Sequence, residues 1–218
     1  MKLLAFDTSS AAITAAVLIA GEIRADVTRI GATSHGELLA PTIAQALNDA
    51  GLAPGDLDGI AVGVGPGPFT GLRVGLVTAR VMAESLGIPA YGVCSLDAIA
   101  LQVVDEALCD QAFAVVTDAR RREVYAATYD AAGLRLTGPD VLPARELSAA
   151  TRQGPVFGIG GALYADEFTD VRAPEFVSAA WLGRVVVEHP DRVTDTTPLY
   201  LRRPDAVENA SRKRVTPA

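Results

Sequence analysis

One segment near the middle of the chain joins an apolar run, a turn and a long helical pattern. The apolar run at 60–64 predicts a strand, which the turn from Gly65 to Pro68 ends. Glycine allows backbone angles that other residues avoid, and proline stops the strand, so this turn is expected to be tight. A helical pattern follows as far as Leu86, and Thr70 is placed to cap its start.

This central helix carries a stripe of side chains with almost no volume. A small residue recurs at every fourth position, and bulky residues flank the stripe. Because small side chains let another backbone approach closely, the stripe predicts a helix that is packed against on more than one side. The small positions are Gly71, Gly75, Ala79 and Ala83, and the bulky ones are Leu72, Leu76, Met82 and Leu86.

The rest of the chain alternates strand and helix patterns. A capping box of Ser34 and Glu37 is expected to open the first helix. The periodicity predicts strands at 2–6, 13–19, 22–30, 89–93, 113–117, 123–129 and 156–159, and helices at 35–50, 95–104, 162–168 and 179–189.

A polar gap at 105–111 is the expected domain boundary. It divides the chain into an N-terminal lobe at 1–105, which holds the two long helices, and a C-terminal lobe at 112–205. The last segment, 206–218, is expected to be a disordered tail.

Composition and charge restrict the classes of function. Of the 218 residues, 50% are hydrophobic and 21% are charged, which supports packed domains. The net charge is −7, and an acidic protein is not expected to bind nucleic acid by itself.

Cys94 and Cys109 lack the spacing of a metal or redox motif and indicate reduced thiols. Asp7 interrupts the N-terminal apolar segment too soon for the apolar core of a signal peptide, and no apolar run is long enough to span a membrane. We therefore expect a cytoplasmic protein.

Two polar or glycine-rich turns are candidates for binding phosphate. One follows the first strand, and the other precedes the central helix, where backbone N–H groups attract anions. Neither the Walker pattern nor the dinucleotide pattern G-x-G-x-x-G is present, so a purely structural role for both turns stays open. The candidate residues are Asp7, Thr8, Ser9, Gly65, Gly67 and Arg73.

Motifs for catalysis and for metal binding are missing. The chain has no G-x-S-x-G elbow, and its two histidines, His35 and His189, form no zinc-binding pattern with the cysteines. His35 is expected to cap or pack rather than to bind a ligand. We therefore predict no catalytic residue and no metal site.

Three segments together resemble the bacterial TsaB (YeaZ) family. They are FDTSS at 6–10, SHGELLAPTIAQALNDAGL at 34–52 and GVGPGPFTGLRVGLVTARVMAESLGIPAYGV at 63–93, and VVTDARRREVYAATYD and PLYLRRPD extend the resemblance. It implies an α/β, actin/hexokinase-like (ASKHA) fold with two mixed-sheet lobes and flanking helices. It also implies a part in making threonylcarbamoyladenosine beside the tRNA anticodon.

The resemblance implies a non-catalytic scaffold subunit that binds a TsaD-type catalytic subunit. The related catalytic subunit carries a metal-binding H-x-x-x-H, whose ligand positions fall here on Ser95 and Ile99. ATP and metal would therefore belong to the partner, with no cofactor in this subunit. A TsaE-type ATPase would join the assembly, tRNA would be met only through the complex, and the chain alone would form a homodimer.

The resemblance places the contact with the partner on the two long helices, where the small-residue stripe allows close approach. On this interpretation Gly75→Leu should block the heterodimer and leave the monomer folded. The expected interface residues are Leu39, Ile43, Gly71, Leu72, Gly75, Leu76, Ala79, Met82 and Ala83.

A hypothesis from a different class is a free-standing ATPase or small-molecule kinase of the same fold. It would use Asp7, Thr8 and Ser9, with the turn from Gly65 to Gly67, to hold phosphates. Tight binding of ATP and magnesium by the lone chain would favour it. A third hypothesis, a metalloprotease, needs a metal site that the sequence does not supply.

Overall fold

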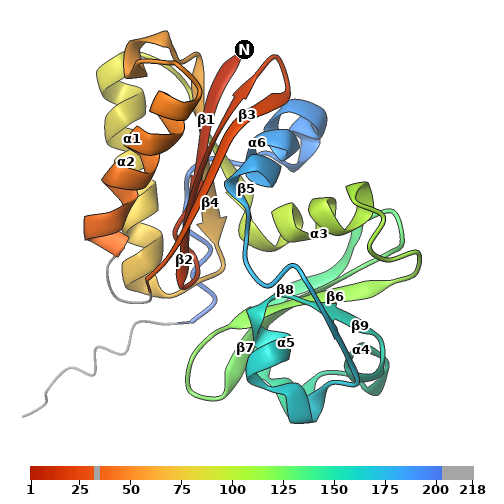
Figure 1. Cartoon of the computed structure of the whole chain (residues 1–218). Coiled ribbons are helices and arrows are strands. Elements are labelled where there is room, and N and C mark those ends of the chain that lie inside the picture. The colour runs from red at the N-terminus through yellow and green to blue at the C-terminus, as the bar shows by residue number, and fades with distance from the viewer. Residues whose placement is uncertain (32–34, 203–218) are drawn as a thin grey trace, which may run out of the picture.

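The first sheet is built on the apolar N-terminal strand. The computed structural model describes residues 1–31 and 35–202. The antiparallel strands β1 (Lys2–Asp7), β2 (Ala12–Ile19) and β3 (Glu22–Ile30) form a meander, and β4 (Gly59–Gly65) and β5 (Ala90–Cys94) extend it in parallel. The strand order is β3-β2-β1-β4-β5 (Figure 1). All of β4 is buried, as its unbroken apolar run requires when helices cover both faces.

The second sheet repeats this topology. β6 (Phe113–Asp118), β7 (Glu123–Tyr129) and β8 (Arg135–Pro143) form an antiparallel meander, and β9 (Pro155–Phe157) and β10 (Asp170–Arg172) lie parallel beside β6. Its order, β10-β9-β6-β7-β8, is the first order read from the opposite edge. Two mixed sheets with flanking helices confirm the predicted fold class.

Helices cover both faces of the first sheet. α1 (His35–Asp49) and α2 (Phe69–Leu86) lie on one face, and α3 (Ser95–Asp105) and α6 (Ala179–Glu188) lie on the other (Figure 1). The short helices α4 (Ala149–Gln153) and α5 (Ile159–Leu163) pack against the second sheet. Single 3₁₀ turns occur at Pro54–Asp56, Ala144–Glu146, Ala165–Glu167 and Pro190–Arg192.

Two large cores result from this layering. One lies between the first sheet and the α1–α2 layer and includes Phe6, Leu39 and Leu72. The other surrounds α3, which is buried along most of its length, and joins Leu3 of the first sheet to Phe113 of the second. Because α3 is shared, burial of apolar surface holds the two sheets together.

Several elements differ from the prediction. Pro68 and not Thr70 occupies the N-cap of α2, because the helix begins at Phe69. The segment around Gly138 and Pro139, where no strand was predicted, forms the edge strand β8, with register shifts against β7. The helix expected at 162–168 is α5 followed by a 3₁₀ turn. The expected cap at Ser34 and the tail at 206–218 lie outside the described residues.

The chain returns to the first sheet near its C-terminal end. α6, which we assigned to the second lobe, packs on β1, β2 and α3. Thr194 then forms a bridge to Gly92 at the edge of β5, and the N–H of Leu199 donates to the carbonyl of Val64 over 2.8 Å. The gap at 105–111 therefore separates the two sheets but not all of their helices.

Candidate functional site

The turn after β1 encloses the carboxylate of Asp7. This side chain is only 1% exposed. Its Oδ1 accepts hydrogen bonds from the N–H and the hydroxyl of Ser9, both over 2.7 Å, and its Oδ2 accepts one from the Ser95 hydroxyl over 2.6 Å. Ser95 Oγ in turn accepts a bond from the Gly65 N–H over 3.3 Å. The carboxylate thus joins the first turn, the end of β4 and the start of α3.

Burial raises the pKa of Asp7, because a carboxylate is poorly solvated in the protein interior. The hydrogen bonds from Ser95 and Ser9 act in the opposite direction, but burial is the larger effect. The charged form is therefore disfavoured in spite of its three donors.

Two glycines let the phosphate-binding candidates come together. A Cβ at Gly63 would lie 1.8 Å from Asp7 Oδ2, and a Cβ at Gly67 would lie 2.3 Å from the carbonyl oxygen of Ser9. Only a residue without a side chain fits at either position. The turn from Gly65 to Pro68 is thus packed directly against the turn at 7–9.

Thr8 connects the same turn to α2. Its hydroxyl donates to the carbonyl of Gly71 over 2.8 Å and accepts from the N–H of Gly75 over 3.1 Å. A Cβ at Gly75 would lie 2.5 Å from Thr8 Oγ1, and one at Gly71 would lie 2.6 Å from the Thr8 carbonyl oxygen. The close backbone approach that the stripe predicted is real, but it occurs inside this chain.

The nine residues predicted at the partner interface do not form an exposed surface of this chain. Eight of the nine are buried against the first sheet and the turn at 7–9, and Met82 is half-buried. Small residues face inward here because the sheet and the Thr8 turn leave no room for larger ones. The expectation that Gly75→Leu would spare the monomer fails for the same reason. The buried eight are Leu39, Ile43, Gly71, Leu72, Gly75, Leu76, Ala79 and Ala83.

The outward side of α2 carries a different row of residues. Phe69, Arg73, Val77 and Val81 follow one another at intervals of four and are all exposed. The exposures of Val77 and Val81 are 53% and 56%, which are high for valine. The Arg73 guanidinium lies over the Phe69 ring, 5.0 Å from its centre. Charged residues at 73, 80 and 84 share this side, and their spacing is the sequence signal that could have identified it.

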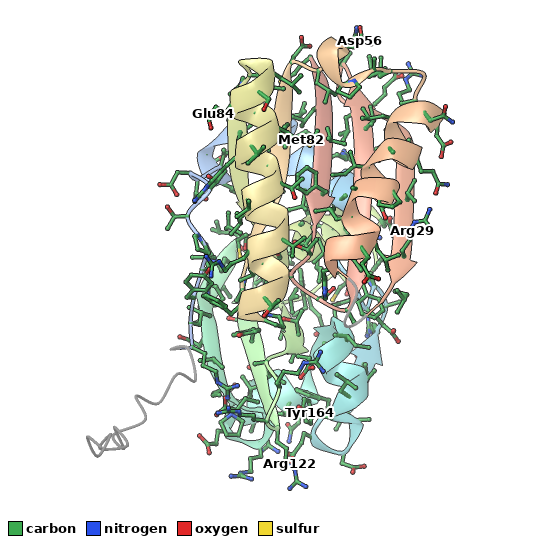
Figure 2. The ribbon with its side chains drawn as sticks, turned by 90° about the vertical axis from the view of Figure 1, so that its left-hand side faces the viewer. Arg29, Asp56, Met82, Glu84, Arg122 and Tyr164 are labelled. Carbon is green, nitrogen blue, oxygen red and sulfur yellow. The ribbon has the colours of Figure 1, made fainter. Side chains whose placement is uncertain are left out.

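The neighbouring helix α1 presents small residues outward. Gly36, Ala40, Pro41 and Ala44 are exposed, while Ile43 and Ala46 face the sheet. Figure 2 shows α1 and α2 side by side on one face of the molecule, with Met82 on α2 between them and Glu84 at the far margin. We call the exposed side of these two helices the α1–α2 face.

The phosphate-binding candidates are only partly brought together. Asp7, Thr8, Ser9, Gly65 and Gly67 meet, but their polar groups largely bond to one another. Arg73 lies apart on the α1–α2 face.

A cleft of about 270 Å³ opens between the turn at 9–11 and the second lobe, where Asp118 and Arg120 line it. Asp7 does not line this cleft, because Ser9 and Ser95 enclose the Asp7 carboxylate. Any ligand in the cleft would meet Ser9 and Ser10 instead.

The start of α3 holds a second buried polar cluster. The Tyr129 hydroxyl donates to Asp97 Oδ1 over 2.8 Å, and Arg135 Nε lies 3.6 Å from the same oxygen. The Arg135 guanidinium also donates to Cys94 Sγ over 3.8 Å. Burial raises the pKa of Cys94 to about 12, with Asp97 adding to the shift. Sequence reasoning missed this cluster, because its four members come from four different elements, β5, α3, β7 and β8.

The residues at the two positions that align with the metal ligands of the related catalytic subunit, Ser95 and Ile99, both make other contacts. Ser95 Oγ is held by Asp7 and Gly65, and Ile99 is fully buried in the shared core. Within residues 1–31 and 35–202, no group of three or more His, Cys, Asp or Glu side chains could hold a metal ion. His35 is also engaged, since its Nε2–H donates to the Ser10 carbonyl over 2.7 Å.

Comparison with known proteins gives a consistent result. The model of the TsaD family, described as tRNA N6-adenosine threonylcarbamoyltransferase, matches residues 27–156. An uncharacterized protein of Mycobacterium tuberculosis is 42% identical over 210 residues, which cover 93% of this chain and 92% of that protein. The tRNA threonylcarbamoyladenosine biosynthesis protein TsaB of Bacillus subtilis is 35% identical over 129 residues, 59% of this chain and 55% of TsaB.

A solved structure agrees with these sequences. YeaZ from Pseudomonas aeruginosa is 27% identical and superimposes with a TM-score of 0.78, covering 92% of this chain and 99% of YeaZ. The chain belongs to the TsaB (YeaZ) family. This confirms the family resemblance and places the chain in a family of tRNA threonylcarbamoyladenosine biosynthesis.

The comparison explains one part of the geometry. The residues matched by the TsaD family model include α1, α2 and α3, which carry the α1–α2 face and the start of α3. The match to the transferase family therefore spans the two helices that form the α1–α2 face. None of the helices in the described part of this TsaB-family chain has the length and apolarity needed to cross a membrane.

Proposed function

We propose that this chain is a non-catalytic scaffold subunit of tRNA threonylcarbamoyl transfer, which docks a TsaD-type catalytic subunit on its α1–α2 face. The observation that carries the proposal is the exposed row of Val77 and Val81 on α2. The exposed valines lie beside small residues of α1 and form an apolar surface. Contact of this surface with water is unfavourable, and a second pair of helices can bury it.

The polar turns support the absence of catalysis in this subunit. The carboxylate of Asp7 is buried and bonded to Ser9 and Ser95, so it is poorly placed to hold a metal–phosphate complex. In this proposal ATP and metal are bound by the partner. A TsaE-type ATPase joins the assembly, and tRNA reaches this chain only as part of it.

The same face also supports a homodimer when the partner is absent. The apolar row is exposed on the isolated chain, and a second copy presents a self-complementary patch of the same kind. Partner and second copy then compete for one surface, so the heterodimer forms as the homodimer disappears.

The test is assembly with the TsaD-type subunit of the same organism, followed by light scattering. Val77→Glu and Val81→Glu should each abolish the one-to-one complex, and the homodimer of the lone chain with it, and should leave the monomer folded, because both side chains are exposed on the single chain. Val187→Glu is the matched control, since Val187 is 38% exposed on α6, on the opposite face of the sheet. A complex that survives both α2 variants would refute this face as the docking surface.

A second measurement separates the scaffold from the free-standing ATPase. Calorimetry of the lone chain with ATP and magnesium should show no tight, magnesium-dependent binding. Tight binding that is lost in Asp7→Asn would favour the kinase-like hypothesis instead.

A further inference from the structure

A cavity of about 430 Å³ lies on the face of the second sheet that is turned away from α3 (Figure 1). Strands β6, β7 and β8 form its floor, and α4 and the 3₁₀ turn before it form a wall. A cavity of this size is in the range of small-molecule sites. Most of its lining is apolar and includes Ala112, Ala114, Ala126, Ala150, Leu136, Leu142 and Leu147.

The space is left open because small side chains lie on both sides of it. Ala114 and Ala126 are buried in the floor, and Ala150 lines the wall on α4, which has only five residues. At the rim, the Leu136 side chain is 57% exposed. A ligand with an apolar body would fill this space and remove apolar surface from water.

One carboxylate on this apolar surface lacks a counter-charge. Asp140 on β8 is opposite Ala126 in the sheet register, so its side chain is on the cavity side of the sheet. Within residues 1–31 and 35–202, the Asp140 carboxylate has no hydrogen bond and no ion pair. The other lining carboxylate, Glu146, has Arg145 at 3.9 Å. None of the described residues that line the cavity is Lys, Arg or His.

Two threonine hydroxyls follow Asp140 on the same face. Thr128 and Thr137 are opposite each other on β7 and β8, and their Oγ1 atoms are 2.7 Å apart. Each oxygen can accept a further hydrogen bond. A primary ammonium group carries three donors and no acceptor, so it matches a carboxylate beside hydroxyl oxygens. An anionic ligand would instead be repelled by Asp140.

We propose that this cavity binds a small primary amine that has an apolar body. The ammonium group donates to Asp140 and to the hydroxyls of Thr128 and Thr137, and the body lies between Ala126 and Ala150. Hydrogen bonds between a cation and a carboxylate are among the stronger ones in proteins, so the charge selects the ligand. No lining residue belongs to α1 or α2, so the site is separate from the α1–α2 face.

The test is an NMR titration of the isotope-labelled full chain at pH 7 with three probes that share a phenyl ring. They are phenethylamine, the neutral phenethyl alcohol and the anionic hydrocinnamate. The amine should shift the amide signals of Ala114, Ala126 and Thr128. It should bind about tenfold or more tightly than the alcohol, because only the amine is a cation that can pair with Asp140. Hydrocinnamate should bind most weakly.

Two variants separate the charge from the apolar space. Asp140→Asn should lower the affinity for the amine about tenfold and leave the affinity for the alcohol unchanged. Ala150→Leu should weaken both ligands, because the larger side chain takes up part of the cavity. Ala150 is exposed, so the leucine should leave the chain folded, which thermal melting checks.

Asp166→Asn is the matched control. Asp166 is an exposed aspartate of the same lobe, in the 3₁₀ turn at Ala165–Glu167, and it does not line the cavity. The affinity of this variant for the amine should stay within about twofold of the parent.

Three results would overturn the proposal. One is the absence of shifts at the cavity amides with the amine at millimolar concentration. Another is equal affinity for amine and alcohol that Asp140→Asn does not change, which would indicate an apolar groove without selection for charge. The third is binding of hydrocinnamate as tight as that of the amine.

Discussion

The Ser95 hydroxyl donates a 2.6 Å hydrogen bond to Oδ2 of Asp7, a residue 88 positions earlier in the chain. The bond connects the end of β1 with the start of α3, and α3 is the helix shared by both cores. The polar turn of this TsaB-family chain is therefore a junction of the fold. Asp7 and Ser9, which the ATPase hypothesis assigned to phosphate binding, are bonded within this junction.

Stability should depend on the pH through Asp7. Because burial raises the pKa of Asp7 above 3.8, the folded state keeps a proton that the unfolded state has lost in the window just above that value. The free energy of unfolding contributed by Asp7 therefore falls as the pH rises through this window. Asp7→Asn removes the charge. In urea unfolding, the free energy of unfolding of the variant should therefore rise relative to that of the parent between pH 4 and pH 7. Parallel pH profiles for the two proteins would contradict this.

Gly75→Ala should destabilise the isolated chain by about 1–3 kcal/mol, because the new Cβ would be forced against Thr8 Oγ1, 2.5 Å away. Gly36→Ala is the matched change on α1, where an added Cβ meets nothing within 4 Å. This second variant should be neutral or more stable by up to about 1 kcal/mol. Urea unfolding measures both. A Gly75 variant as stable as the parent would show that the Thr8 contact relaxes freely.

Tyr129→Phe should lower the free energy of unfolding by about 1–3 kcal/mol, since it removes the hydroxyl that donates to the buried Asp97. Asp97 Oδ1 then keeps only the ion pair with Arg135, at 3.6 Å, among the contacts described above. Tyr91→Phe serves as the control, because the described residues offer the Tyr91 hydroxyl no hydrogen bond and its ring is half-buried. Thermal melting compares the two variants. Equal melting temperatures would mean that the Asp97 cluster adds little.

Both cysteines should be unreactive in the folded protein. Cys94 and Cys109 are buried, and the pKa of Cys94 is raised to about 12, so almost none of this thiol is ionised at pH 8. A thiol-specific reagent should label neither residue in native buffer and both in guanidinium chloride. Rapid native labelling would indicate that the junction around α3 opens.

Much of the local structure follows from sequence alone. The strand at 59–65, the tight turn and the long α2 were predicted within one or two residues, because apolar periodicity and glycine–proline turns act locally. His35 was expected to cap or pack, and its ring hydrogen-bonds the Ser10 carbonyl. β8 was missed, since its glycine and prolines look like turns and its pairing with β7 is irregular.

What the sequence by itself determined is most of the long helices and strands, the class of fold and the family. Only the tertiary structure decided which side of each helix faces inward. The stripe from Gly71 to Ala83 is suited to any close neighbour, and the Thr8 turn of the same chain proved to be that neighbour. It equally decided that α6 returns to the first sheet. The physical reason is that periodicity shows which residues along an element face protein and which face water. The identity of the neighbour that buries them depends on packing between segments far apart in the sequence.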